Sequence, residues 1–320
     1  MPFKVVSYTK GRVTDHGFLP PAKAKSINDD VVWLDIKNPT KDELALLQEA
    51  YGFHPLAIDD CLHDIQRPKI EEYDGYVFII LKRLCCQQTV KSTQIAVFVG
   101  GNYLATIAQE EVPLLEDIRK KILSGGSKTA SKKTDFLLYR IIDRVVDEYF
   151  EVLDRIEDTI EVIEKEVIGK PTQKTAQKIF KVKKDLLYFR KPVWPTRDML
   201  HLLQASGQVR IITPELMPYY RDIYDHIIQV IDLTETYREL ASSSLDIYLS
   251  AVSNSMNEVI KVLTVLASIF LLPTLISGVY GMNYHLIPDN NYEYGFELVL
   301  LLMLLSTIVP WVYFRRKGWI

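Results

Sequence analysis

The chain has 320 residues, of which 48% are hydrophobic and 25% are charged, and its formal net charge is −3. A charge this close to neutral gives no overall basic field, so it argues against a nucleic-acid partner. The apolar residues are concentrated after residue 257, while residues 1–256 have the composition of a charged, water-exposed domain.

Residues 1–130 alternate strand-like and helix-like segments. Thr40 is followed three residues later by Glu43, the spacing of a capping box, which predicts a helix over 40–51, and Pro55 begins a second short helix to 62. Runs of β-branched and aromatic residues predict five strands, at 3–8, 31–36, 76–84, 95–99 and 103–107. The strands do not alternate regularly with long helices, so we expect an α+β domain with a mixed sheet.

A helical hairpin is predicted over about 134–201. Residues 135–166 carry eleven acidic and four basic side chains, 170–198 carry nine basic and two acidic, and Gly169 and Pro171 separate the two. One interpretation is a solvated pair of helices that neutralise each other. The other is an acidic helix that concentrates cations.

A single long helix is predicted from about 215 to 280, because only Pro273 interrupts the pattern. Its length is about 100 Å at 1.5 Å per residue. We expect the apolar stripe of this stalk to need the same helix from other copies, which predicts a homo-oligomer. The stripe consists of Ile223, Ile227, Val230, Leu233, Tyr237 and Leu240.

Two membrane spans are predicted, at about 259–280 and 297–314, within a membrane domain covering 257–320. Each is close to the length that crosses a hydrocarbon core of about 30 Å. Basic residues follow the second span directly, whereas the intervening loop has no Lys or Arg and carries Asp289, Glu293 and Glu297. The positive-inside rule therefore predicts that both termini are cytoplasmic and the acidic loop is outside.

The absence of an apolar segment at the N-terminus supports this orientation, since we expect no signal peptide. The three cysteines, Cys61, Cys85 and Cys86, form no Cys-x-x-Cys pair, which is typical of a reducing compartment. No Walker A motif or other nucleotide fingerprint is present, so we expect no nucleotide partner and no organic cofactor.

One face of the first span is polar at its ends and mostly apolar between them. Such a face can line a pore whose apolar middle gates by dewetting. The alternative is a helix-packing stripe, since membrane interfaces also favour small residues. The face consists of Asn257, Ile260, Leu263 or Thr264, Ala267, Leu271, Thr274 and Gly278.

The residues that follow this face carry a family resemblance. Tyr280-Gly281-Met282-Asn283, at the outer end of the first of two spans, resembles the signature of the CorA magnesium transporters. Further similar segments are 66–69, 219–226, 257–264 and 315–319. The family's outer loop usually reads Met-Pro-Glu-Leu, but here residues 287–290 read Ile-Pro-Asp-Asn. The resemblance implies a homopentamer with a cytoplasmic α/β domain, long stalk helices and a central pore in the cell (inner) membrane.

The proposed filter suits Mg²⁺ as the transported ion. Mg²⁺ dehydrates reluctantly, so a ring of neutral Asn283 oxygens can accept hydrogen bonds from its bound water. Gly281 permits close approach of backbones, whereas the soft thioether of Met282 is a poor ligand and is expected to pack. Co²⁺ and Ni²⁺ remain further candidate ions. The membrane potential alone favours inward movement of a divalent cation.

The resemblance also implies a regulatory Mg²⁺ bound between subunits. Asp60 and Asp222 are the implied ligands, with Asp59 and Asp143 as a neighbouring pair. Facing carboxylates repel unless a cation holds them, so bound Mg²⁺ is expected to lock the interface and provide feedback. Two alternatives to a magnesium channel remain: a zinc transporter of the same fold, and a membrane-anchored coiled-coil scaffold that conducts nothing. We expect no enzymatic activity.

Overall fold

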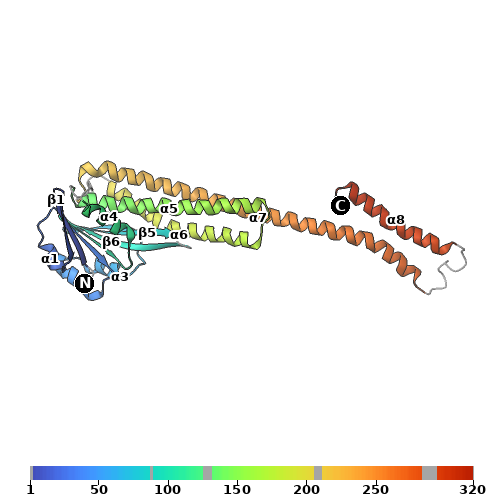
Figure 1. Cartoon of the computed structure of the whole chain (residues 1–320), viewed down its shortest axis with the longest axis horizontal. Coiled ribbons are helices and arrows are strands. Elements are labelled where there is room, and N and C mark those ends of the chain that lie inside the picture. The colour runs from blue at the N-terminus through green and yellow to red at the C-terminus, as the bar shows by residue number, and fades with distance from the viewer. Residues whose placement is uncertain (1–2, 87–88, 125–131, 205–210, 283–293, 320) are drawn as a thin grey trace. The chain divides into compact units, whose positions relative to one another are not determined.

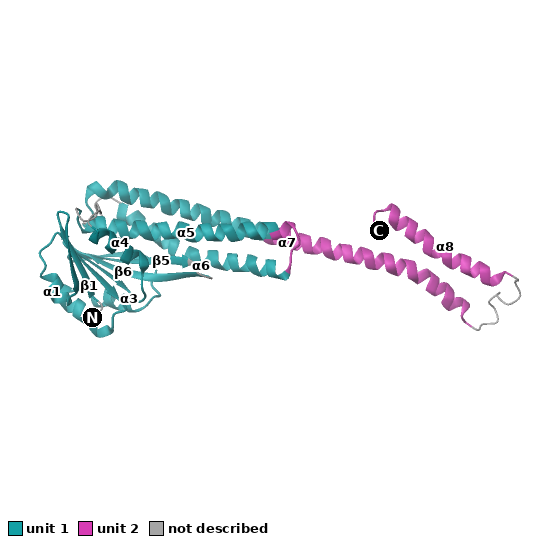
Figure 2. Ribbon diagram, viewed as in Figure 1, with its two compact units in different colours: residues 1–165, 173–244 teal, residues 166–172, 245–320 magenta. Residues whose placement is uncertain are grey.

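The computed structural model of the chain describes residues 3–86, 89–124, 132–204, 211–282 and 294–319. Two compact units are present (Figure 2). The first contains residues 1–165 and 173–244, and the second contains residues 166–172 and 245–320.

The first unit is built on a seven-stranded sheet with the order β2-β1-β3-β7-β6-β5-β4 (Figure 1). Only β3 and β7 are parallel, and all other neighbours are antiparallel, so the predicted mixed sheet is confirmed. The strands are β1 (Phe3–Thr9), β2 (Arg12–Phe18), β3 (Val31–Lys37), β4 (Lys69–Tyr73), β5 (Tyr76–Cys86), β6 (Val90–Val99) and β7 (Tyr103–Ala108). The sequence did not predict β2 and β4, which are the two edge strands.

Three short helices cover one face of the sheet: α1 (Pro21–Lys25), α2 (Lys41–Tyr51) and α3 (Pro55–Leu62). The predicted capping box at the start of α2 is present, because the side chains of Thr40 and Glu43 each bond the other residue's backbone N–H. Leu44 and Leu47 of α2 are fully buried against this face, together with Phe78 and Phe98 of the sheet.

Longer helices cover the other face. They are α4 (Pro113–Leu123), α5 (Thr134–Ile168) and α6 (Gln173–Gln204). Alternate residues of β5 point to this side, and Arg83 there pairs with Glu148 of α5. Tyr149 of α5 packs edge-on against Phe189 of α6. The acidic side chains of α5 pair mainly along their own helix, as in Arg144–Glu151, which agrees with a solvated charged surface.

Helix α7 (Met217–Tyr280) is one helix of 64 residues, preceded by a 3-10 turn (Pro214–Leu216). The expectation that its apolar stripe needs other copies is wrong for most of the soluble part, although Leu240 remains 38% exposed. Ile223, Ile227 and Val230 are fully buried within one chain, and Tyr237 is 6% exposed.

The long helix α5 covers this stripe. The Tyr220 hydroxyl donates to the carbonyl of Asp135 (3.1 Å), and farther along both helices the Tyr237 hydroxyl donates to Glu157 (2.7 Å). The two helices therefore run side by side in the same direction. No local pattern in α7 shows that α5, a helix of 35 residues in the same chain, covers this stripe.

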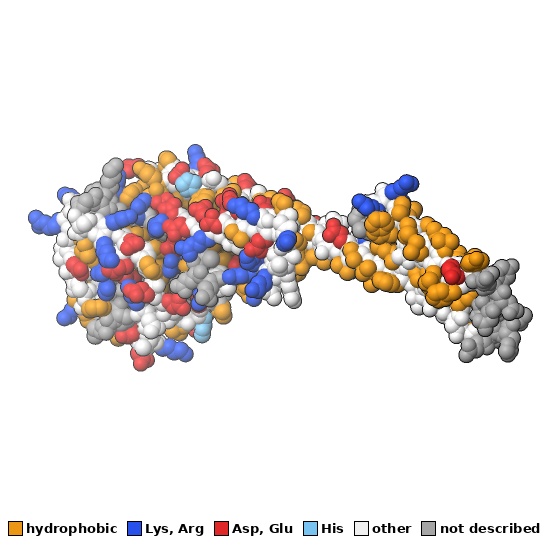
Figure 3. Space-filling model, turned by 45° about the vertical axis from the view of Figure 1, so that its right-hand side comes forward, with side chains coloured by type: hydrophobic (Ala, Val, Ile, Leu, Met, Phe, Trp, Pro, Cys, Tyr) orange, Lys and Arg blue, Asp and Glu red, His pale blue; other side chains and the backbone are white. Residues whose placement is uncertain are grey.

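The second unit consists mainly of the rest of α7 and of α8 (Gly295–Arg316). Both helices are long and apolar enough to cross a membrane, and almost none of their apolar residues is buried within the chain. Apolar side chains dominate the surface of this unit (Figure 3). The two helices flank an apolar cleft of about 390 Å³ between Leu272 and Pro310. Apolar surfaces this large are unfavourable in water. They require burial in an apolar medium such as a bilayer, or against other copies of the chain.

Candidate functional site

The C-terminal end of α7 closes in a tight turn at the residues that carry the family resemblance. The N–H of Gly281 donates to the carbonyl of Ser277 (2.9 Å), and that of Met282 donates to Val279 (3.3 Å). A Cβ atom at Gly281 would lie 3.0 Å from the Ser277 carbonyl oxygen, so this close approach favours glycine. The Met282 side chain is 60% exposed.

Other residues predicted near this mouth are only partly covered by the structure. Asn283, Asp289 and Glu293 lie outside the described residues. Glu297 is exposed in the first turn of α8, where a carboxylate interacts favourably with the positive end of the helix dipole.

The predicted pore face of α7 is exposed along its whole length in the single chain. Leu263 is 65% exposed and Leu271 is 69% exposed, and positions off this face are exposed as well, such as Phe270 at 66% and Leu275 at 61%. The remaining members are also exposed, namely Asn257, Ile260, Thr264, Ala267, Thr274 and Gly278. Leu271 additionally lines the cleft beside α8. No described residue of the chain covers this face, which suits a pore lining, contact with other copies or contact with lipid.

The hydroxyl groups on this part of α7 bond to their own helix. Thr264 donates to the carbonyl of Ile260 (2.7 Å), and Thr274 donates to that of Phe270 (2.7 Å). Each hydroxyl hydrogen is thereby used, and the oxygen presents its lone pairs outward. The polar positions of the face can therefore accept hydrogen bonds from the water of a hydrated cation.

Asp60, at the end of α3, is held by its own chain. Its carboxylate accepts one hydrogen bond from Gln66 (2.7 Å) and one from the Lys69 ammonium (2.7 Å), and its side chain is 15% exposed. Lys69 also bonds Glu71 (2.6 Å), and these two carboxylates hold the pKa of Lys69 above its usual value despite its partial burial. A metal at Asp60 would have to compete with this ammonium.

The other predicted regulatory residues lie on three separate elements. Asp59 of α3 and Asp222 of α7 are exposed. Asp143 of α5 pairs with Arg140 (2.9 Å), yet burial and the neighbouring Asp147 raise the pKa of its carboxyl, and Asp222 contributes in the same direction.

Within the described residues, no group of three or more His, Cys, Asp or Glu side chains is placed to hold a metal ion. A single chain therefore brings Asp143 and Asp222 near each other but does not assemble a site with Asp60. A metal at these carboxylates requires ligands from another chain or from water.

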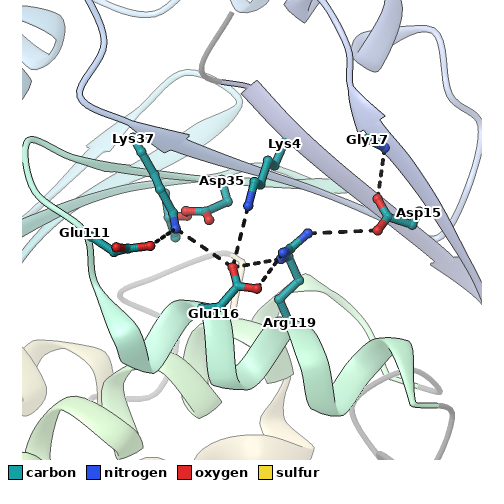
Figure 4. A network of polar contacts seen from close by, with 9 residues as sticks. Lys4, Asp15, Gly17, Asp35, Lys37, Glu111, Glu116 and Arg119 are labelled. Carbon is teal, nitrogen blue, oxygen red and sulfur yellow. Dashed lines mark hydrogen bonds and ion pairs between the residues drawn. The ribbon is translucent and has the colours of Figure 1, made fainter.

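A second polar cluster, which the sequence did not reveal, joins three strands to α4 (Figure 4). Glu116 of α4 pairs with Arg119 (2.6 Å) and lies 3.8 Å from Lys4 and 3.9 Å from Lys37. Asp35 lies beside them, 2% exposed, and burial raises the pKa of its carboxyl. Its members come from distant parts of the chain, so no local pattern predicts the cluster. It fastens α4 to the sheet.

These features together define a membrane protein with a large α+β domain, a long helix that ends in a first apolar span, and a second apolar span in α8. Residues 28–316 match the family described as CorA-like Mg²⁺ transporter protein. The cobalt/magnesium transport protein CorA of Thermotoga maritima is 35% identical over 324 residues, an alignment that covers 100% of this chain and 91% of that protein. The chain belongs to the CorA-like Mg²⁺ transporter family.

Solved structures agree with this assignment. The complete structure of the CorA magnesium transporter from Methanocaldococcus jannaschii superimposes with a TM-score of 0.87 and 28% identity, covering 100% of this chain and 99% of that one. The ZntB cytoplasmic domain from Vibrio parahaemolyticus is only 16% identical, with a TM-score of 0.66, and covers 79% of this chain and 100% of that chain. That distant likeness extends to the fold alone.

Proposed function

We propose that this chain forms a homopentameric channel for passive Mg²⁺ influx, with Co²⁺ and Ni²⁺ as further possible cargo. Two spans in one chain cannot enclose a pore, so several copies must surround an axis. The uncovered face of α7 from Asn257 to Gly278 carries this proposal, because it leads directly to the turn at Gly281. Gly281, Met282 and Asn283 form the selectivity filter at the outer mouth.

The driving force is the membrane potential. With both termini in the cytoplasm, inward movement of two charges gains about 4.6 kcal/mol per 100 mV. No nucleotide hydrolysis is needed for this movement. Asp289, Glu293 and Glu297 raise the local cation concentration outside without selecting among cations.

A cytoplasmic Mg²⁺ bound between subunits regulates the channel. Asp60 of one subunit and Asp222 of the next hold the ion, with Asp59 and Asp143 as a second pair. Loss of the ion leaves carboxylates that repel and so releases the closed state. The exposure of Asp222 within one chain supports this arrangement, since its carboxylate is available to a neighbour.

Uptake into proteoliposomes, measured one ion at a time, tests the proposal. We expect Mg²⁺ uptake that increases with an inside-negative potential and needs no nucleotide. Preferential Zn²⁺ uptake would identify a zinc transporter of the same fold. No uptake of any divalent cation by correctly assembled protein would identify a non-conducting scaffold.

A further inference from the structure

A groove of about 970 Å³ in the first unit lies between α6 and the segment that joins α3 to β4. It is separate from the spans, and it adjoins the proposed regulatory site through Gln66, which lines the groove and donates to the Asp60 carboxylate (2.7 Å). Its volume is within the range of sites that hold small organic ligands, about 300–1,000 Å³. A second groove of about 550 Å³ shares Lys184 and Tyr188 with it and extends it along α6.

Basic side chains converge on this groove without acidic partners. Arg67, Lys184, Arg190 and Lys191 line it, and none of them takes part in an ion pair among the residues that the structure describes. The two carboxylates of the lining are already used, since Asp64 pairs with Lys82 (2.5 Å) and Asp198 pairs with Arg197 (2.7 Å). Four like charges on one concave surface repel each other, and a bound polyanion removes this repulsion.

Aromatic rings stand among these charges. The ammonium groups of Lys184 and Lys191 lie 5.7 Å and 5.0 Å from the centre of the Tyr188 ring, and the Arg190 guanidinium lies 4.7 Å from that of Trp194. Tyr188 is 45% exposed, so part of its ring is available to a ligand. Basic groups that bind phosphates beside rings that stack on a base are the combination used to hold nucleotides by their phosphates and base faces.

We propose that this groove binds a nucleoside triphosphate. Lys184, Lys191 and Arg67 hold the phosphate chain, the guanidinium of Arg190 can bind phosphate oxygens in a bidentate manner, and Tyr188 offers a surface for the base. No nucleotide fingerprint was found in the sequence because such motifs describe one local loop with backbone donors. Here the donors are side chains from α6 and from the loop before β4.

Part of the groove wall is held by hydrogen bonds within the chain. The Lys82 side chain is 7% exposed and donates to both the carbonyl (2.9 Å) and the carboxylate of Asp64. Nearby, Gln94 donates to the carbonyl of Asp60 (2.7 Å) and Gln109 donates to that of Cys61 (2.8 Å). The bonds to Asp64 anchor the segment three residues before Arg67, and those to Asp60 and Cys61 anchor the end of α3.

The test is equilibrium binding of ATP to the full-length protein in detergent, followed by tryptophan fluorescence and by calorimetry. Free Mg²⁺ is held constant with a metal buffer, so that chelation by ATP does not mimic binding. We expect saturable binding that Lys184→Glu and Lys191→Glu each weaken by about tenfold or more. Lys174→Glu is the matched control, because it makes the same charge change on an exposed position of α6 outside the groove, and it should bind as the parent does.

Three results would overturn the proposal. The first is that the folded parent protein does not bind ATP. The second is that Lys184→Glu and Lys174→Glu lose ATP affinity to the same extent. The third is inorganic tripolyphosphate binding as tightly as ATP, which would exclude recognition of the base. Tyr188→Ala should weaken the binding of ATP but leave the binding of tripolyphosphate unchanged. Binding is measured without transport, so the result does not depend on the proposed channel function.

Discussion

The guanidinium of Arg83 donates two hydrogen bonds to the carboxylate of Glu148, from Nε at 2.8 Å and from Nη2 at 3.0 Å. The side chains are 13% and 9% exposed, so β5 and α5 are joined by a largely buried ion pair. Burial opposes ionisation and raises the pKa of Glu148 despite the attraction of Arg83. Removing one partner therefore leaves the other charge buried and uncompensated.

We expect Glu148→Ala to destabilise the first unit by about 3 kcal/mol. Glu161→Ala is the control, because its pair with Lys165 is 60% and 76% exposed and should contribute about 0.5 kcal/mol or less. Urea unfolding of the full chain, monitored by near-ultraviolet circular dichroism, gives both values. If the two variants lose the same free energy of unfolding, burial does not determine how much the Arg83–Glu148 pair stabilises the fold.

The proposed filter predicts that Asn283→Ala abolishes Mg²⁺ uptake while the oligomer remains assembled, because the ring of neutral oxygens is lost. Met282→Leu is the matched control. It keeps a side chain of similar volume and should retain uptake, since the thioether is not expected to coordinate Mg²⁺. Proteoliposome uptake with size-exclusion analysis measures both properties. Normal uptake by assembled Asn283→Ala protein would exclude this filter.

Neutralising Asp289, Glu293 and Glu297 together should lower uptake at low Mg²⁺ and low salt, with little effect at saturating Mg²⁺. The reason is that exposed charges act only through a local concentration that salt screens. Uptake curves at two ionic strengths measure the effect. A changed order of preference among Mg²⁺, Co²⁺ and Ni²⁺ would instead assign the loop to the filter.

Asp222→Ala should weaken both the Mg²⁺-dependent protection of the protein from protease and the feedback inhibition of uptake, because the regulatory ion loses a ligand. Asp222→Lys should remain protected without Mg²⁺, since a fixed positive charge replaces the ion. Asp225→Ala changes another exposed carboxylate of α7 and is the control. Unchanged Mg²⁺ dependence in both Asp222 variants would remove Asp222 from the sensor.

Asp35 predicts a pH dependence of stability. Burial raises the pKa of its carboxyl above 3.8, although Lys37, Arg119 and Lys4 oppose the shift. The folded state thus holds this proton more tightly than the unfolded state, and the parent loses stability as pH rises from 3.8 through the raised pKa.

Asp35→Asn carries no titrating proton at this position. The melting temperature of the variant relative to the parent should therefore increase over that pH interval and then level off. Asp232→Asn, at an exposed position of α7, should show no such trend. A constant difference between Asp35→Asn and the parent at all pH values would contradict the prediction.

The sequence predicted the inner part of the sheet, the α2 capping box and the single long helix, because these depend on local patterns. It missed β2 and β4 for one physical reason. As edge strands they have fewer buried positions, and β2 has none that is fully buried, so they lack the apolar alternation of inner strands.

The sequence predicted the candidate site only at positions that belong to a local motif. The motif at Gly281 is such a case, and the close approach of this residue to the Ser277 carbonyl explains why the position favours glycine. The pairing of Asp60 with Lys69 and the basic groove on α6 depend on tertiary contacts that no spacing reveals. The buried stripe of α7 was misjudged for the same reason, since its partner α5 lies far away in the sequence.

The order in which the strands and the apolar spans follow one another along the chain matters for biosynthesis. Every strand of the sheet precedes the first apolar span, and about 150 residues separate the end of β7 from that span, which at roughly 5–20 residues per second takes on the order of 10–30 s to translate. Small α/β domains fold in milliseconds to seconds. The strands of the sheet can therefore pair with one another before the hydrophobic helices emerge, so we expect the insertion machinery to receive these helices after the sheet has formed.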